Sequence, residues 1–161
     1  MKIKHNYSLL LAFAAIFIFM NAQIFLKQSI KTQGEVIYFR LAPVDPRAFM
    51  MGDYMALNFE HNLRNYSNQN MQTVIVTLNE HNIVINAEPY NNTTVQDHQR
   101  LFDIQDQLRP DRYYFQEGHA NAYEAAQYGL FRYVAPSQFL LNDLTDESLI
   151  AINPNTNPIN D

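Results

Sequence analysis

The first 34 residues constrain this chain more than any other segment, because they form an apolar leader that contains no acidic residue. Residues 9–20 are apolar without a break, and 16 of the 18 residues from 9 to 26 are apolar. As a helix, residues 9–26 span roughly 27 Å, which is close to the ~30 Å hydrocarbon thickness of a bilayer. The leader is therefore either a membrane-spanning segment or a signal peptide.

The residues around the end of the apolar core distinguish an anchor from a cleaved signal peptide. Cleavage requires small residues in an A-x-A pattern, and the best candidate, which ends at Ala22, has Met20 at its first small position. Lys2 and Lys4 precede the apolar core and give a slight positive-inside bias. We therefore favour an uncleaved anchor over 1–27, with its N-terminal tip in the cytoplasm, and keep a cleaved signal peptide as the alternative.

Charge and composition exclude several classes of function. All 16 Asp and Glu lie behind residue 34, and residues 28–161 contain only eight Lys and Arg, a formal charge of −8. A nucleic-acid-binding domain carries a basic patch instead, so no nucleic-acid partner is expected. The chain contains no Cys, which excludes disulfides, thiol nucleophiles and thiolate metal centres.

The remainder of the chain is dominated by short strand patterns. Residues 35–42 are rich in β-branched and aromatic residues that alternate in polarity, which predicts a strand. The same criteria predict strands over 53–61, 73–78, 83–87, near 100–108, and over 112–117, 130–135 and 138–144. The strands over 73–78 and 83–87 are expected to form a hairpin, because Asn79 and Asn82 flank the turn between them. One helix is predicted over the Ala-rich residues 119–128, with Gly129 as its C-cap.

These elements predict a β-rich α+β fold behind an N-terminal transmembrane helix. The expected architecture is a small antiparallel sandwich or partly open barrel with one short helix. We expect a tether over 28–34, a periplasmic domain over 35–152 and a flexible tail over 153–161. The protein is then a single-pass inner-membrane protein with its C-terminal domain in the periplasm.

A Pro-rich loop before the second predicted strand gathers charged residues. Asp45, Arg47 and Asp53 lie within nine residues of one another, and Asp53 follows Gly52. This group is either an acidic–basic pocket for a polar ligand or an ion pair that closes the loop. We favour the ion pair, because Asp in turns commonly accepts hydrogen bonds from local amides.

Glu117 and His119 flank Gly118 where a predicted strand meets the predicted helix. On a strand both side chains would face one side, which suits an acid–base pair or half of a metal site. We favour the alternative that one of them caps the helix. The other His residues do not have the H-x-x-x-H spacing of zinc helices, so neither a metal nor a cofactor is expected.

Aromatic residues are abundant near the C-terminal half, among them Tyr123 and Tyr128. They could line a carbohydrate or peptide groove, but such residues more often fill the core of a sheet that packs on a helix, and we favour the core. The sequence contains no G-x-S-x-G, S-x-x-K or P-loop motif.

Two blocks of the chain resemble the bacterial GDYXXLXY family, which is named for its motif. Residues 52–59, GDYMALNF, follow Pro43-Val44-Asp45-Pro46-Arg47 and depart from the name motif at Phe59, where the family has Tyr. Residues 115–119 and 123–129 are similar to the second block of the family. With the N-terminal helix, the likeness covers nearly the whole chain. Because Phe59 has no hydroxyl, we expect packing rather than catalysis at that position.

The resemblance implies a membrane-anchored protein that is usually encoded beside a multi-pass membrane protein, and it implies no substrate, cofactor or catalytic residue. We therefore favour a periplasmic accessory or binding module that docks on a polytopic membrane partner, through residues 43–59 and 115–129. The candidate binding residues are Asp45, Arg47, Gly52, Asp53, Tyr54, Glu117, Gly118, Tyr123 and Tyr128. Two alternatives are an envelope hydrolase that uses Asp53, Glu117 and His119, and a domain that senses a small ligand through an aromatic groove.

Overall fold

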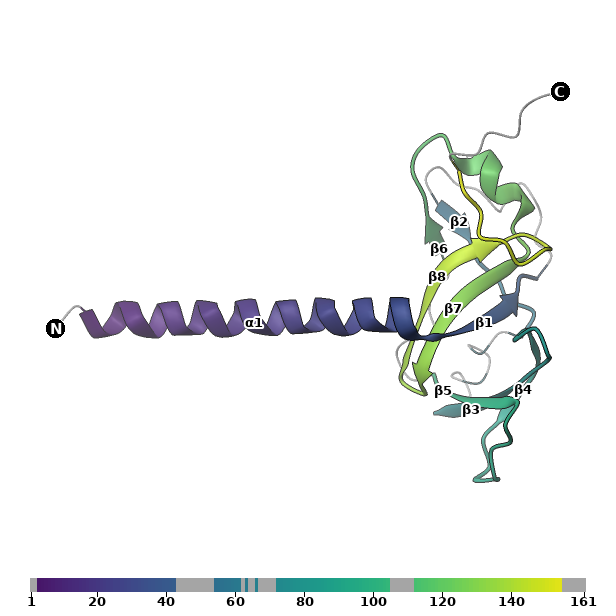
Figure 1. Ribbon diagram of the computed structural model, residues 1–161, viewed down its shortest axis with the longest axis horizontal. Coiled ribbons are helices and arrows are strands. Elements are labelled where there is room, and N and C mark those ends of the chain that lie inside the picture. Colours follow the sequence, from purple (N-terminus) through teal and green to yellow (C-terminus); the bar gives the residue numbers. More distant parts are fainter. Residues whose placement is uncertain are drawn as a thin grey trace.

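The computed structural model describes residues 3–42, 54–61, 63, 66, 72–104 and 112–154. These residues form a long helix, eight strands and a short 3₁₀ helix, so the predicted β-rich α+β class is confirmed (Figure 1). The elements are α1 Ile3–Gln33, β1 Glu35–Arg40, β2 Tyr54–Ala56, β3 Thr73–Leu78, β4 Val84–Pro89, β5 Gln99–Asp103, β6 Arg112–Tyr114, η1 Ala120–Ala125, β7 Tyr128–Ala135 and β8 Gln138–Thr145.

The apolar leader forms one continuous helix, α1, that projects away from the strands (Figure 1). Its 31 residues span about 46 Å, and its part Ser8–Gln33 is long and apolar enough to cross a membrane. No side chain in its most apolar stretch is buried inside the protein. An uncovered apolar helix is unfavourable in water, so this finding is consistent with a single-pass membrane anchor.

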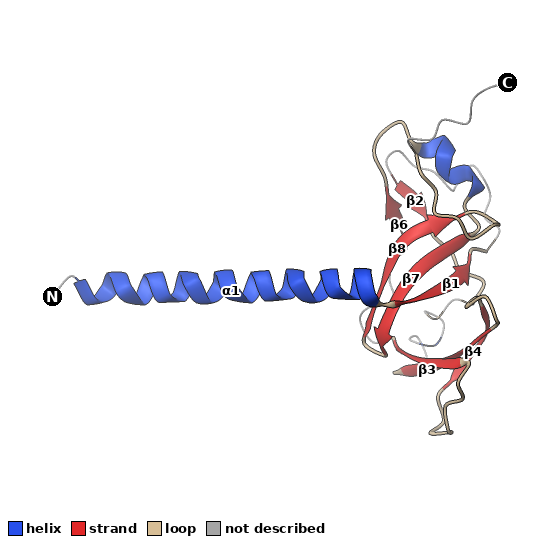
Figure 2. Cartoon of the chain, in the orientation of Figure 1, coloured by secondary structure: helices blue, strands red, loops and turns tan. Residues whose placement is uncertain are grey.

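The strands form three antiparallel sheets, and the described part of the chain does not close into a barrel (Figure 2). The first sheet has the order β1-β7-β8, the second contains β2 and β6, and the third has the order β4-β3-β5. The predicted hairpin between β3 and β4 is confirmed. In its turn the Oδ1 atom of Asn79 accepts hydrogen bonds from the backbone N–H groups of His81 and Ile83, each at 2.9 Å.

The main hydrophobic core lies between the first and third sheets. The apolar residues that alternate along β1, Ile37 and Phe39, are buried, and they face Val74 and Val76 of β3 across the core. Phe102 of β5 lies at its centre, with edge-on ring contacts to Phe39 at 5.6 Å and to Phe139 at 4.8 Å. Edge-to-face geometry is favoured for aromatic pairs because the positive ring edge meets the negative ring face.

The connection between α1 and β1 is short and closely packed. Residues 28–33 of the predicted tether belong to α1, and Gly34 alone separates the helix from β1. A Cβ atom on Gly34 would lie 2.6 Å from the carbonyl oxygen of Ile30 and 3.1 Å from the Cβ of Arg132. Glycine is therefore required at position 34 because neighbouring backbone and side-chain atoms leave no room for a Cβ atom, and not because the backbone turns there.

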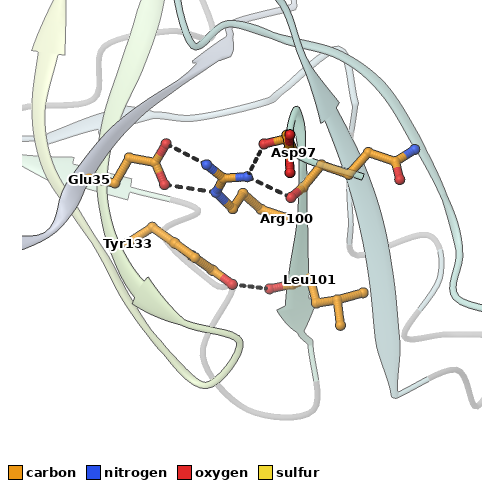
Figure 3. Close-up of polar contacts among 6 residues, drawn as sticks. Glu35, Asp97, Arg100, Leu101 and Tyr133 are labelled. Carbon is orange, nitrogen blue, oxygen red and sulfur yellow. Dashed lines mark hydrogen bonds and ion pairs between the residues drawn. The ribbon is translucent and has the colours of Figure 1, made fainter. Parts of the chain in front are cut away.

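Arginine side chains from the sheets also stabilise the connection between α1 and β1. The Nη1 atom of Arg132 on β7 donates to the carbonyl oxygen of Gly34 at 3.0 Å. Arg100 on β5 forms a two-point ion pair with Glu35, at 2.8 and 3.0 Å (Figure 3). This ion pair raises the pKa of Arg100. Beside it the Tyr133 hydroxyl donates to the carbonyl oxygen of Leu101, which adds a second link between the first and third sheets.

The predicted helix over 119–128 is wrong in type and in length. The structure has the 3₁₀ helix η1 over Ala120–Ala125, and β7 already begins at Tyr128. The backbone N–H of Gln127 donates to the carbonyl oxygen of Thr145 at 2.8 Å, and the carbonyl oxygen of Gln127 accepts from the backbone N–H of Leu41. These bonds to neighbouring strands use backbone groups that a longer helix would need. Six residues are too few to nucleate a stable α-helix.

The prediction that Gly129 caps a helix is wrong as well. Gly129 lies inside β7, paired with Phe39 of β1 and Leu144 of β8. A Cβ atom there would lie 2.8 Å from the ring of Phe59 and 3.2 Å from Leu141. The residue leaves room for an aromatic ring over the middle strand of the sheet.

The other predicted boundaries differ mainly in length. The strand predicted over 53–61 is described only at Tyr54–Ala56, with a separate bridge between Leu41 and Phe59. The strand near 100–108 ends at Asp103, and residues 105–108 lie outside the described part. Most of the tail, 155–161, also lies outside it.

The close contacts of Gly34 predict a large effect of a single methyl group. Gly34→Ala should lower the free energy of unfolding by about 1–3 kcal/mol, because the neighbouring backbone must move. The measurement is urea unfolding of the full chain in mild detergent, followed by near-UV circular dichroism. Gln33→Ala, on an exposed site one residue earlier, is the control and should change stability by less than about 0.5 kcal/mol. Equal stability of Gly34→Ala and the control would contradict the prediction.

Candidate functional site

The second sheet brings the two motif blocks of the sequence together. β2, which contains Tyr54 of the first block, pairs with β6, which directly precedes the second block. The register sets Tyr54 opposite Tyr114 and Met55 opposite Tyr113. Because side chains alternate along a strand, each pair faces a different side of the sheet. In Figure 1 β6 lies on the side of the domain from which α1 projects.

The outer face of this sheet carries an aromatic and cationic cluster, the β2–β6 patch, made of the exposed residues Arg112 and Tyr114 and the half-buried Tyr54. The rings of Tyr54 and Tyr114 lie 5.7 Å apart, and the Arg112 guanidinium lies 5.1 Å from the centre of the Tyr54 ring. Tyr114 is 68% exposed. A cation over a ring at the protein surface contributes about 0.5–1 kcal/mol, so the three side chains support one another while Arg112 and Tyr114 stay exposed.

The inner face of the same sheet covers a second, smaller core. Met55 is completely buried there, together with Leu57, Tyr123 and Leu144. The ring of Phe115 stacks on Tyr123 with a separation of 5.0 Å. This core joins the first block, η1 and the end of β8 into one unit, which holds the β2–β6 patch in place.

Phe59, the position at which the name motif departs, lies between the two cores. Its ring contacts Phe39 at 6.0 Å and Phe131 at 5.7 Å, both in edge-on geometry. It also packs against residues of both cores. The expected packing role of Phe59 is confirmed.

A tyrosine hydroxyl is held inside the second core by a carboxylate. The Oη atom of Tyr113 donates to Oδ1 of Asp143 at 3.0 Å, and the same oxygen accepts from the backbone N–H of Leu144. Burial, reinforced by the negative charge of Asp143, raises the pKa of Tyr113 far above its usual range. The hydroxyl therefore stays protonated and acts as a fixed hydrogen-bond donor rather than as a base.

Glu117 and His119 lie in the turn between β6 and η1. Glu117 and Gly118 are exposed, whereas His119 is half-buried. His119 occupies the N-cap position of η1, but its side chain makes no capping hydrogen bond, so the favoured capping role is wrong for this residue. The part of the chain that the structure describes holds no group of three or more His, Cys, Asp and Glu that could bind a metal ion.

The remaining candidate residues divide into buried ones and ones outside the described part. Tyr123 is 5% exposed and Tyr128 is also buried, so both act mainly through packing, as the core interpretation expected. Asp45, Arg47, Gly52 and Asp53 lie outside the described residues. The meeting of Asp53 with Glu117 and His119 therefore stays a prediction.

Sequence reasoning singled out neither Arg112 nor the outward position of Tyr114, which it grouped with the aromatic residues that line a groove or, as favoured, fill the core; the core interpretation is wrong for Tyr114, which is 68% exposed. It did not single out Asp143 either. The alternation over 112–114 carries the signal for the first two, because a buried Tyr113 implies outward neighbours on both sides. Asp143 gives no comparable signal, since its partner Tyr113 lies 30 residues away in the sequence.

Comparison with known proteins gives a single family. A family model described as GDYXXLXY protein matches residues 16–143. The match includes most of α1, both motif blocks and most of β8. No curated protein and no solved structure significantly matches the chain.

The buried Tyr113 hydroxyl predicts a specific dependence of stability on pH. Tyrosines of the unfolded chain ionise near pH 10, whereas Tyr113 keeps its proton in the folded protein, so its contribution to stability is fully present below pH 10 and is lost progressively as the pH rises above 10. Tyr113→Phe should lower the free energy of unfolding by about 1 kcal/mol at neutral pH and make its fall above pH 10 shallower. Urea unfolding between pH 7 and pH 11 measures both effects.

Tyr114→Phe, on the exposed face of the same strand, is the matched control for this experiment. It should retain wild-type stability at neutral pH, because the Tyr114 side chain is largely in solvent. The same stability loss in both variants, or none in either, would contradict the assigned role of Tyr113.

Proposed function

The chain belongs to the GDYXXLXY family, and we propose that it is a membrane-anchored accessory module that docks on a polytopic membrane protein. In this proposal α1 crosses the inner membrane with its N-terminus in the cytoplasm, and the strands form a periplasmic domain. The observation that carries the docking role is the exposed β2–β6 patch, which belongs to the face formed by the two motif blocks.

The short connection between α1 and β1 supports a partner that lies at the membrane. Residues 27–33 extend α1 by only about 10 Å beyond the apolar stretch that ends at Leu26. Gly34 and the Glu35–Arg100 ion pair leave little freedom for the domain to move away. A polytopic membrane protein presents its loops in this zone, within reach of the domain.

The composition of the patch supports recognition of a protein. Tyr and Arg are enriched among interface residues that contribute most to binding, because each buries a large, rigid surface and also forms hydrogen bonds. The contact between Tyr54 and the exposed Tyr114, with Arg112 over the Tyr54 ring, has this composition. The hydrolase alternative gains no comparable support, because Glu117 lies on the exposed surface of a turn rather than in an enclosed site.

The docking role predicts that cross-linking depends on position. A photo-reactive amino acid in place of Tyr114 should cross-link a polytopic membrane protein in native membranes, at native expression. The same group in place of Ile85, an exposed residue of β4, is the control and should not. Mass spectrometry identifies the product, and recovery of the protein alone from both positions would count against docking.

Truncation of the patch gives a second measurement of the same interaction. Tyr114→Ala and Arg112→Ala should each reduce the recovery of the identified partner roughly tenfold, as expected for residues worth 1–2 kcal/mol. Ile85→Ala should leave recovery unchanged. Folding is checked by circular dichroism, and equal recovery with all three variants would exclude the β2–β6 patch as the docking surface.

The proposed orientation predicts the labelling of single cysteines, which is feasible because the chain contains none. Ser137→Cys, in the exposed turn between β7 and β8, should react with a membrane-impermeant maleimide once the outer membrane is permeabilised. His5→Cys should react only after the inner membrane is opened. The opposite pattern would reverse the orientation, and loss of His5→Cys from the mature chain would show that the leader is cleaved.

A further inference from the structure

We propose that α1 pairs in the membrane with α1 of a second copy of this chain, through the helix face centred on Asn21. The inference rests on the proposed anchoring, because α1 must remain in the bilayer. It is separate from docking, since the face lies on α1 and the β2–β6 patch lies on the domain.

Asn21 lies inside the apolar stretch of α1. It is five residues before Leu26, or about 8 Å along the axis from the end of the apolar stretch. A shallow groove runs along its face of the helix, lined by Phe17, Ile18, Asn21, Phe25 and Gln28 among others. These residues recur at spacings of three, four and seven, which places them on one side of a helix.

The amide of Asn21 is only partly satisfied within its own helix. Its Nδ2 atom donates one hydrogen bond to the carbonyl oxygen of Phe17 at 2.8 Å. On the described part of α1 the second N–H and the Oδ1 oxygen have no hydrogen-bond partner and would face hydrocarbon. Leaving such groups unpaired in lipid is unfavourable, so a polar partner at the same depth stabilises the helix.

A second copy supplies that partner by symmetry. Two chains inserted in the same orientation carry Asn21 at the same depth, and an amide is both donor and acceptor, so the two side chains complement each other. Gln28 lies seven residues further along the same face and repeats the arrangement near the membrane surface. Seven-residue spacing of contact positions is the repeat of two helices that cross at a small angle.

The domain leaves this face accessible. Gln28 is exposed, while its neighbours Ser29 and Ile30 are half-buried near the sheets. Gln23, the other amide in the apolar stretch, is two residues from Asn21 and therefore points to nearly the opposite side of α1. The two amides thus provide a matched pair for a test.

The test uses disulfide cross-linking of the full chain in native membranes. Ala14→Cys lies seven residues before Asn21, on the same face, and Ala12→Cys lies on the opposite face. Oxidation should give a dimer of this chain from Ala14→Cys and little from Ala12→Cys. Adding Asn21→Leu should lower the cross-linked fraction roughly three- to tenfold, whereas adding Gln23→Leu should leave it within about twofold.

Several outcomes would overturn the proposal. These are equal cross-linking from both faces, no effect of Asn21→Leu, an equal effect of Gln23→Leu, or a product that joins one copy to a different protein. The mass of the mature chain and its recovery in the membrane fraction are measured on the same samples. A full-length, membrane-bound monomer rejects the pairing alone, whereas a shortened soluble chain rejects the proposed anchoring as well.

Discussion

The direct connection of α1 to β1 determines how the whole protein is oriented. Gly34 permits the helix to reach the sheet at a distance that any Cβ atom would prevent, and Arg132 holds its carbonyl oxygen. The Glu35–Arg100 ion pair is only partly buried and so contributes modestly to stability, but its two-point geometry ties β1 to β5. The domain therefore follows the helix, and in the proposed membrane anchoring both proposed surfaces keep their positions relative to the bilayer.

The pairing of β2 with β6 has the equivalent role for the candidate site. This pairing places Met55 and Tyr113 on the inner face, where they form the second core with Tyr123 of η1, and leaves the β2–β6 patch on the outer face. The Tyr113–Asp143 hydrogen bond anchors this sheet to β8. A short two-stranded sheet is marginal by itself, so its stability depends on this core.

Several parts of the fold could be predicted because local rules decide them. The alternation in β1 puts Ile37 and Phe39 in the core, and Asn79 forms the turn between β3 and β4, since neither depends on distant residues. The helix predicted over 119–128 failed for the opposite reason. Its helix propensity is outweighed by the backbone hydrogen bonds of Gln127 and by the strand pairing of Tyr128 and Gly129, whose partners lie far away in the sequence.

The candidate site shows the same division. Tyr54 and the turn at Glu117 were identified from the motif blocks, but the grouping of Arg112 and Tyr114 with Tyr54 on one outer face followed only from the register of β2 and β6. By itself the sequence determined the apolar helix, the family, the β-rich class and most strands, because hydrophobic pattern and turn residues act over short distances. Only the tertiary structure decided the length of η1, the close contact at Gly34 and the patch, because each depends on atoms from segments that are far apart in the chain.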